Sequence, residues 1–176
     1  MITIENKVHV QGIVQLSTFT PGVIPLLIGQ GLSLPEAIRM ARGLGYQRNH
    51  IEVPNLVTTV GKQFISRRIT GEETVALKYM AIGTGTTAPA VTDTKLVTES
   101  MRKLLTECVQ GDNFFYSSAF LLASECAIHI KEGGLFGGST ALAAADSGWL
   151  LCRFLLDFDN SSDPQDVTIQ HTGEVS

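Results

Sequence analysis

Apolar and polar side chains alternate through the first sixteen residues of the chain. Between Ile2 and Leu16 most apolar residues fall at even positions, and odd positions include the charged Glu5 and Lys7. Successive side chains of a strand point to opposite faces, so a period of two predicts a strand with one buried face. We therefore expect an N-terminal strand or hairpin that ends at Thr20-Pro21-Gly22.

Two later stretches have the spacing of amphipathic helices. Ser33 and Glu36 form an S-x-x-E capping box, which satisfies backbone N–H groups at the start of a helix. That helix buries one face and ends at the glycines of 43–45. A second helix is predicted over Asn55–Arg68, with Asn55 as its N-cap and with these inward-facing residues: Leu56, Val57, Val60 and Phe64.

Beyond residue 73 the pattern changes to short strands separated by turn residues. The predicted strands are Thr74–Ile82, Phe114–Ser124, Cys126–Lys131, Trp149–Phe158 and Val167–Val175. Such a series indicates a mainly β fold, an antiparallel β-sandwich with a few short helices. A parallel sheet would need helices between the later strands, and only Thr94–Cys108 could supply one there. Val167–Val175 has a polar face and is expected to be an edge strand.

Composition narrows the classes of function. The 176 residues suit one compact domain, and 44% of them are hydrophobic, which is enough for a real core. The net charge is −4 and no basic block is present, so nucleic-acid binding has little electrostatic support. The three cysteines, Cys108, Cys126 and Cys152, have no CxxC spacing, which argues against a disulfide framework or a zinc site and favours a reducing cytoplasm.

We expect neither export nor membrane insertion of this chain. Residues 1–7 carry no charged-then-apolar signal pattern. The apolar run at 23–28 is too short to cross a bilayer, which takes about 20 residues. We expect a chain without a membrane partner.

The stretch YMAIGTGTTAP, residues 79–89, raises the question of a phosphate-binding loop. Gly83-Thr84-Gly85 lacks the third glycine of a dinucleotide-binding motif and the Lys-Ser/Thr of a Walker loop. Pro89 also prevents a helix from starting directly after the glycines. The favoured interpretation is a strand that ends in a glycine-rich turn, and no cofactor is expected.

Other candidate catalytic groups have simpler structural interpretations. Cys126 and His129 would lie on opposite faces of a strand, which predicts a buried cysteine and a surface histidine rather than a nucleophile–base pair. Asp157 is expected to be a solvated strand residue, and Asp159 is expected to begin a turn. Three charges follow the GTG segment, and we expect an Asx turn from Asp93 and a local pair between Glu99 and Arg102. No catalytic or metal-binding set is therefore predicted.

The segment from Tyr79 to Lys103 resembles a pattern in bacteriophage tail-fibre, tail-collar and baseplate-associated proteins. In that pattern a strand runs into G-x-G-T-T, a proline-containing loop, Asp-Thr, a leucine, a glutamate and an arginine. The matching positions here are Gly83, Gly85, Thr86, Thr87, Pro89, Asp93, Thr94, Leu96, Glu99 and Arg102.

Three further segments fit the same family in the same order. The helix candidate around 55–69 precedes the GTG strand. KEGGLFGG has the family's glutamate before Gly-Leu-Phe, and GWLLCRFLLDF has its leucine pair and arginine; the residues are Glu132, Gly134, Leu135, Phe136, Leu150, Leu151 and Arg153. The extra Gly133 departs from the β-branched residue that is frequent there. No fibre shaft or receptor-binding tip is seen.

The resemblance implies a non-enzymatic virion structural protein, made in the bacterial cytoplasm, on the tail, baseplate or neck. Its partners would be copies of itself and other virion proteins, without nucleic acid. Residues 1–54 are then expected to be a docking segment, and residues 55–176 a β-sandwich virion domain. Gly83 and Gly85 are expected to adopt backbone conformations closed to other residues. The alternatives are a capsid decoration protein and, in another class, a small-ligand or nucleotide-binding enzyme domain.

Overall fold

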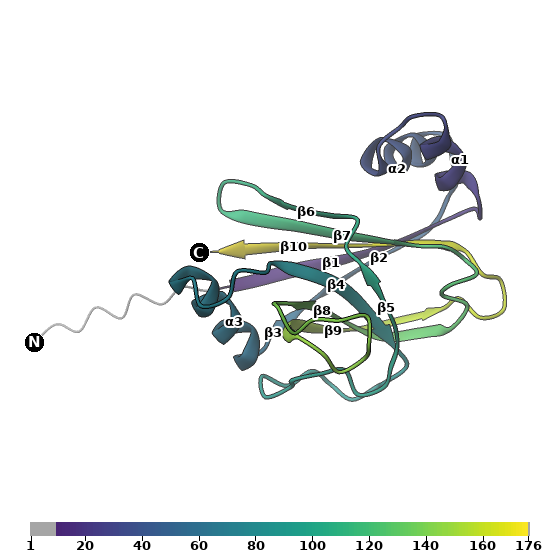
Figure 1. The fold of residues 1–176 in the computed structure, drawn as a ribbon. Coiled ribbons are helices and arrows are strands. Elements are labelled where there is room, and N and C mark those ends of the chain that lie inside the picture. Colours follow the sequence, from purple (N-terminus) through teal and green to yellow (C-terminus); the bar gives the residue numbers. More distant parts are fainter. Residues whose placement is uncertain (1–9, 176) are drawn as a thin grey trace, which may run out of the picture.

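Residues 10–175 of the computed structural model form two five-stranded antiparallel sheets packed face to face (Figure 1). The first sheet has the order β2-β1-β10-β7-β6, and the second has the order β3-β9-β8-β4-β5. The strands of the first sheet are β1 Val10–Phe19, β2 Gln47–Pro54, β6 Glu107–Gln110, β7 Phe114–Leu121 and β10 Asp166–Val175. Those of the second are β3 Leu56–Val57, β4 Leu77–Gly83, β5 Glu99–Leu104, β8 His129–Gly137 and β9 Trp149–Asp159. The predicted antiparallel β-sandwich is therefore confirmed.

The hydrophobic core lies between the two sheets. Its fully buried members include Leu16 and Ile169 from the first sheet and Met80, Leu135 and Phe154 from the second. Apolar side chains at alternate strand positions supply this layer, because one face of each sheet must leave water. The even positions of β9 from Leu150 to Phe158 are all buried, and so are Leu151 and Arg153 at odd positions, so this strand is covered on both faces over 150–154.

Three short helices complete the fold: α1 Val23–Gly29, α2 Leu34–Gly43 and α3 Thr59–Thr70. The predicted capping box begins α2, where the backbone N–H of Ser33 donates to the Glu36 carboxylate at 2.9 Å. The α1 and α2 helices share a small core and project from one end of the sandwich, whereas α3 lies at the other end (Figure 1). Among residues 10–175, no helix combines the length and apolar content needed to cross a bilayer.

The helix predicted over Asn55–Arg68 begins later than expected. Residues 56–57 form β3, which pairs with β9, and Thr58 rather than Asn55 is the N-cap of α3. The Thr58 hydroxyl oxygen accepts from the Gly61 N–H at 2.9 Å and donates to the Leu150 carbonyl at 2.6 Å. Because one threonine hydroxyl makes hydrogen bonds to both the helix and the sheet, α3 begins at this point.

The pairing of the strands shows where other expectations fail. Val167–Val175 is not an edge strand, because β10 lies between β1 and β7 and is paired along both sides. Thr94–Cys108, the stretch that a parallel sheet would have needed as a helix, contains none and holds β5 and the start of β6, in agreement with the antiparallel fold. The α1 helix and β2 were not predicted. Pro25 lies in the first turn of α1, where a helix tolerates proline.

The predicted N-terminal strand is confirmed from Val10 onward, and its first part, residues 1–9, lies outside the described residues. β1 pairs with β10 from Val10 opposite Val175 to Phe19 opposite Asp166. β1 and the last strand, β10, therefore share one sheet. The assignment of residues 1–54 to docking stays a prediction.

Candidate functional site

The residues of the phage-like pattern meet on the outer face of the second sheet, beneath the β4–β5 loop. This loop, residues 84–98, folds back over β4, β8 and β9. Leu96 anchors it, because its side chain is almost fully buried in a cluster with Tyr79, Phe136 and Leu150. The loop thus covers a sheet face that would otherwise expose apolar side chains to water.

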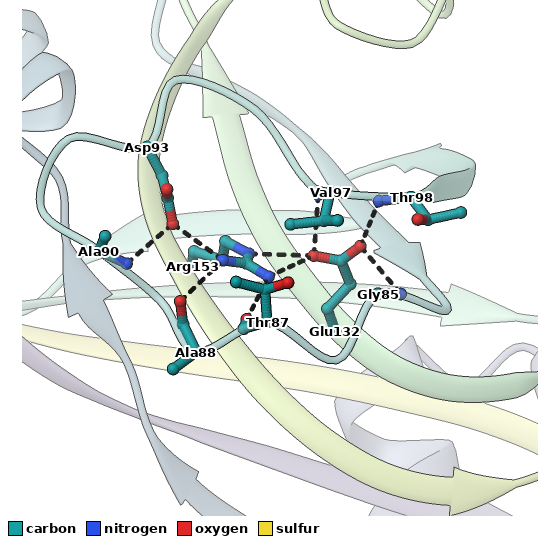
Figure 2. A network of polar contacts seen from close by, with 9 residues as sticks. All are labelled: Gly85, Thr87, Ala88, Ala90, Asp93, Val97, Thr98, Glu132 and Arg153. Atoms are coloured by element: carbon teal, nitrogen blue, oxygen red, sulfur yellow. Dashed lines mark hydrogen bonds and ion pairs between the residues drawn. The ribbon is translucent and has the colours of Figure 1, made fainter.

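Glu132 of β8 is the central acceptor under the loop (Figure 2). Its Oε1 accepts backbone N–H groups from Gly85 at 3.1 Å and Thr98 at 2.6 Å, and its Oε2 accepts that of Val97 at 3.1 Å. One carboxylate therefore joins the two ends of the loop. Hydrogen bonds to an ionised acceptor are stronger than neutral ones, so this side chain sets the loop's path.

Arg153 of β9 balances the charge of Glu132 and binds the middle of the loop. Its Nε donates to Glu132 Oε2 at 3.0 Å, and its Nη2 lies 2.8 Å from the same oxygen in an ion pair. Nη2 also donates to the Thr87 carbonyl at 2.7 Å, and Nη1 donates to the Ala88 carbonyl at 3.4 Å and to Asp93 at 2.9 Å (Figure 2). All three nitrogens of the guanidinium group are therefore engaged.

The Glu132–Arg153 pair is wholly inside the protein, since both residues are 0% exposed. Removing two charges from water is expensive, and it is tolerated only where further hydrogen bonds satisfy the remaining atoms. The β4–β5 loop supplies those bonds from its backbone. We call this set, Glu132, Arg153, Asp93 and the loop backbone, the Glu132 clamp.

Asp93 has a different role from the predicted Asx turn. Its carboxylate accepts the Ala90 N–H at 2.9 Å, three residues earlier in the chain, and also binds Arg153 (Figure 2). Arg153 lies on the outer face of the second sheet. Its face is covered by the loop and is not exposed to solvent.

Close packing explains the glycines of the motif. A Cβ on Gly85 would lie 2.3 Å from Glu132 Oε1, and a Cβ on Gly83 would lie 2.1 Å from the Thr98 carbonyl oxygen. Neither glycine has a positive φ angle, so the predicted special backbone conformation is wrong. Gly134 has the same function on β8, where a Cβ would lie 3.1 Å from the Leu96 side chain. The glycines allow the loop to approach the sheet.

A second buried pair fixes the neighbouring loop, residues 138–148 between β8 and β9. The predicted Glu99–Arg102 pair is present, with Arg102 Nη2 donating to Glu99 at 2.7 Å, and it is buried. Arg102 Nη1 also donates to the carbonyls of Leu142 at 3.2 Å and Ser147 at 3.0 Å. Its guanidinium stacks 4.3 Å from the centre of the Phe136 ring, a favourable cation–π contact.

The two loops lie against each other and are tied to the sheet at several points. Lys95 and Asp146 form an exposed ion pair of 2.8 Å between them, which raises the pKa of Lys95. Glu73 accepts the Ser139 N–H at 2.9 Å, and hydrogen bonds from Ser139 and Val75 lower the pKa of its carboxyl. The loops therefore form one ordered surface.

That surface is poor in charge. The exposed residues of the β4–β5 loop are mainly threonine, alanine and valine: Thr84, Thr86, Thr87, Ala88, Ala90, Val91, Thr92, Thr94, Lys95, Val97 and Thr98. Its charged residues, Asp93 and Lys95, are both in ion pairs. Pro89 is half-buried in the same loop. Short side chains lose little conformational freedom on contact, which suits such a surface for binding another protein.

The sequence-predicted residues thus fall into groups. Four of them belong to the Glu132 clamp: Gly85, Thr87, Asp93 and Glu132. Glu99 and Arg102 form the second pair, with Phe136 beside it. Gly83 and Gly134 allow close packing, and the remaining residues of the motif lie on the loop: Thr86, Pro89 and Thr94. Leu135 belongs instead to the intersheet core. The central role of Arg153 was not predicted from the sequence. The signal that could have indicated it is a single arginine inside the otherwise apolar run of 149–156.

Other candidate residues are separate from this surface. Cys126 is buried and its pKa is raised by burial to about 11, whereas His129 is partly exposed and contacts Asp157 at 2.6 Å. The predicted buried cysteine and surface histidine are therefore confirmed. Within residues 10–175, no three His, Cys, Asp or Glu side chains gather in a way that could hold a metal ion.

No family model, curated protein or solved structure matches this chain. The resemblance to phage tail and baseplate proteins accordingly rests on the motif residues themselves.

Proposed function

We propose that this chain is a non-enzymatic structural protein of a bacteriophage virion, present in several copies on the tail, baseplate or neck. The observation that supports the proposal most is the Glu132 clamp. The charged residues of the phage-like pattern form ion pairs with one another and hydrogen bonds with the backbone of two surface loops. Their role is to present a fixed surface.

A fixed surface favours assembly. Binding is weakened when a loop must be ordered at the same time, and a loop that is already held avoids that cost. Glu132 and Arg153 hold the β4–β5 loop at both ends and in its middle. The exposed threonine and alanine side chains then meet a partner with little charge to desolvate.

The same contacts weigh against the nucleotide-binding alternative. A phosphate loop needs free backbone N–H groups that converge on the anion. Here the N–H groups of Gly85, Val97 and Thr98 already point at the Glu132 carboxylate (Figure 2). An anion would have to displace that carboxylate from beside its own arginine.

The location of the chain in a particle tests the proposal. Gold-labelled antibody against the chain would be applied to purified particles and viewed by electron microscopy. Label at the tail, neck or baseplate is the expected result, and label over the head would replace the proposal with a capsid decoration protein. A chain found only in infected-cell lysate would overturn the virion assignment.

A matched pair of variants tests the loop surface. Thr86→Arg adds a charge to the exposed β4–β5 loop, and Ser162→Arg adds the same charge to the exposed β9–β10 turn. We expect Thr86→Arg alone to reduce incorporation into particles, measured by immunoblotting. Equal incorporation of both variants would exclude this loop from the contact.

A further inference from the structure

β2 forms an open edge of the first sheet. Its eight residues, Gln47–Pro54, pair with β1 on one side, and no strand of residues 10–175 pairs with its other side. The other outer strands of the two sheets are shorter, with two residues in β3, six in β5 and four in β6. Arg48, Asn49, His50 and Glu52 are all exposed. An exposed edge of this length presents backbone groups with which another strand can pair.

The hydrogen bonds between β1 and β2 determine which residues of β2 face outward. The Asn55 N–H donates to the Gly12 carbonyl at 3.2 Å, so these two residues form a hydrogen-bonded pair. Hydrogen-bonded and non-hydrogen-bonded pairs alternate along an antiparallel ladder, which leaves His50 and Glu52 in non-hydrogen-bonded pairs with β1. The backbone N–H and C=O groups of His50 and Glu52 therefore point away from β1, toward the open edge. Pro54 has the same phase but no N–H, so the series of outward donors ends before it.

We propose that two copies of this chain pair through β2 as an antiparallel dimer centred on His50. In this register His50 lies opposite its own counterpart, and Arg48 of each copy lies opposite Glu52 of the other. Opposite charges at facing positions of two strands attract each other, and this attraction occurs on both sides of the symmetry axis. In the next register with the same hydrogen-bond phase, Arg48 would lie opposite Pro54, which has neither a charge nor an N–H. The charge pattern thus favours a second copy as the partner, in one register.

The arrangement of these charges distinguishes β2 from a protected edge. Proteins commonly block an open edge with charged side chains, a proline or a bulge. Charges of one sign would repel when the strand meets its own copy. Arg48 and Glu52 have opposite signs and lie at equal distances along the chain from His50, so the same strand attracts itself.

Two local features of β2 are compatible with the contact. A bulge leaves Arg48 without a partner on β1, but it lies near the start of the strand and leaves Asn49–Pro54 regular. Arg48 also contacts Asp163 of the β9–β10 turn at 2.9 Å, in an exposed ion pair. A guanidinium group has several N–H donors, so Arg48 can bind Asp163 and Glu52 of a second copy together.

The ends of the paired strands match as well. Tyr46 is 42% exposed directly before β2, and the exposed Pro54 ends the strand. The register centred on His50 places Tyr46 of each copy opposite Pro54 of the other. Apolar surface therefore leaves water at both ends of the contact.

A contact between identical surfaces is isologous and closes after two copies. The first sheets of the two copies then form one continuous sheet, with the two β2 strands at its centre. The inference deepens the proposed function, because it supplies a first step for multi-copy assembly. It rests on that function only for its biological setting.

Sedimentation equilibrium of the purified chain tests the contact at low ionic strength, where salt screens charges least. We expect the average mass of the wild type to rise with concentration and to level off at that of a dimer. Arg48→Glu sets like charges opposite Glu52, and Glu52→Arg sets like charges opposite Arg48. Each variant should raise the dissociation constant at least about tenfold, which corresponds to about 1.4 kcal/mol. Lys62→Glu is the control, because Lys62 is exposed on α3 and outside the β2 edge.

Mixing the two defective variants gives the decisive result. One variant has acidic residues at both positions and the other has basic residues at both, so opposite charges meet on both sides of a mixed dimer. The mixture should therefore dimerise where each variant alone is monomeric. The double variant Arg48→Glu/Glu52→Arg restores the pattern in reverse and should dimerise like the wild type.

These rescues separate the contact between copies from effects within one copy. The double variant loses the contact of Arg48 with Asp163 and the hydrogen bond of Glu52 with Gln15, as the single variants do. Recovery of the dimer can then come only from complementary charges on the two β2 strands. It also shows that the variants are folded.

Two outcomes would overturn the inference: a wild-type chain that is monomeric at all concentrations, or a mixture of the single variants that stays monomeric. The labelling of particles is a separate readout. Label on the virion together with a monomeric chain removes only the β2 contact. Dimerisation without label on the virion removes only the proposed function.

Discussion

Gly85→Ala tests the view that the GTG glycines serve close packing. The added methyl carbon would lie 2.3 Å from Glu132 Oε1 and 2.8 Å from the Val97 Cβ, both far inside contact distance. The carboxylate or the loop must therefore move, and the hydrogen bond between Gly85 and Glu132 breaks. Hydrogen bonds to a charged group contribute about 1.5–3 kcal/mol, and overpacking costs about 1–3 kcal/mol.

We expect Gly85→Ala to lower the free energy of unfolding by about 2–4 kcal/mol, since alanine recovers about 0.4–1 kcal/mol through the unfolded chain. Equilibrium urea denaturation measures this loss. Hydrogen exchange should also be faster at the amides of Gly85's neighbours in the clamp, Val97 and Thr98, which bond to Glu132. The variant should be incorporated poorly into particles.

Gly43→Ala is the matched control. Gly43 ends α2, its φ is not positive, and a Cβ there would meet nothing within 4 Å. Alanine at that position should leave stability unchanged or raise it by up to about 1 kcal/mol. The packing argument fails if Gly85→Ala unfolds at the same urea concentration as Gly43→Ala and keeps its loop amides protected.

Further predictions concern buried polar and ionisable groups. Glu132→Gln leaves the buried Arg153 with Asp93 as its remaining carboxylate partner and should cost up to about 3–5 kcal/mol in urea denaturation; a loss below about 1 kcal/mol would contradict a buried pair. Burial lowers the pKa of His171 to about 4, so the unfolded chain binds this proton more readily and stability should fall by about 3 kcal/mol between pH 7 and pH 4. That contribution should be absent in His171→Gln, and an acid profile identical to that of the wild type would refute the assignment. Burial also raises the pKa of Cys126 and Cys152 to about 11, so Ellman's reagent should react quickly with exposed Cys108 alone, whereas fast reaction of all three native thiols would contradict their burial.

The α1 helix and the start of α3 show the limits of local pattern. Residues 23–28 are apolar throughout, so no periodicity marked the helix, and only its packing on α2 and Phe19 fixes it. Asparagine is a favoured N-cap residue, yet the helix begins at Thr58 and not at Asn55, because residues 56–57 pair with β9 as β3. Tertiary contacts overrode propensity at both places.

The candidate site was partly accessible from the sequence. The motif residues were identified, and so was the pairing of Glu99 with Arg102. The burial of Arg153 was not, because alternation assigns a residue only to one face of a strand. Whether that face meets water depends on a loop that begins about 70 residues earlier in the chain.

The sequence by itself determined that this chain is an antiparallel β protein, where most of its later strands lie, and where α2 begins. These features follow from side-chain alternation, turn residues and a capping box, which all act within a few residues. The tertiary structure alone decided which strands are central and which charges are buried. β10 is central because it pairs with β1 from the other end of the chain, and Glu132 and Arg153 are buried because the β4–β5 loop folds over them. Such contacts join distant residues, and no local pattern encodes them.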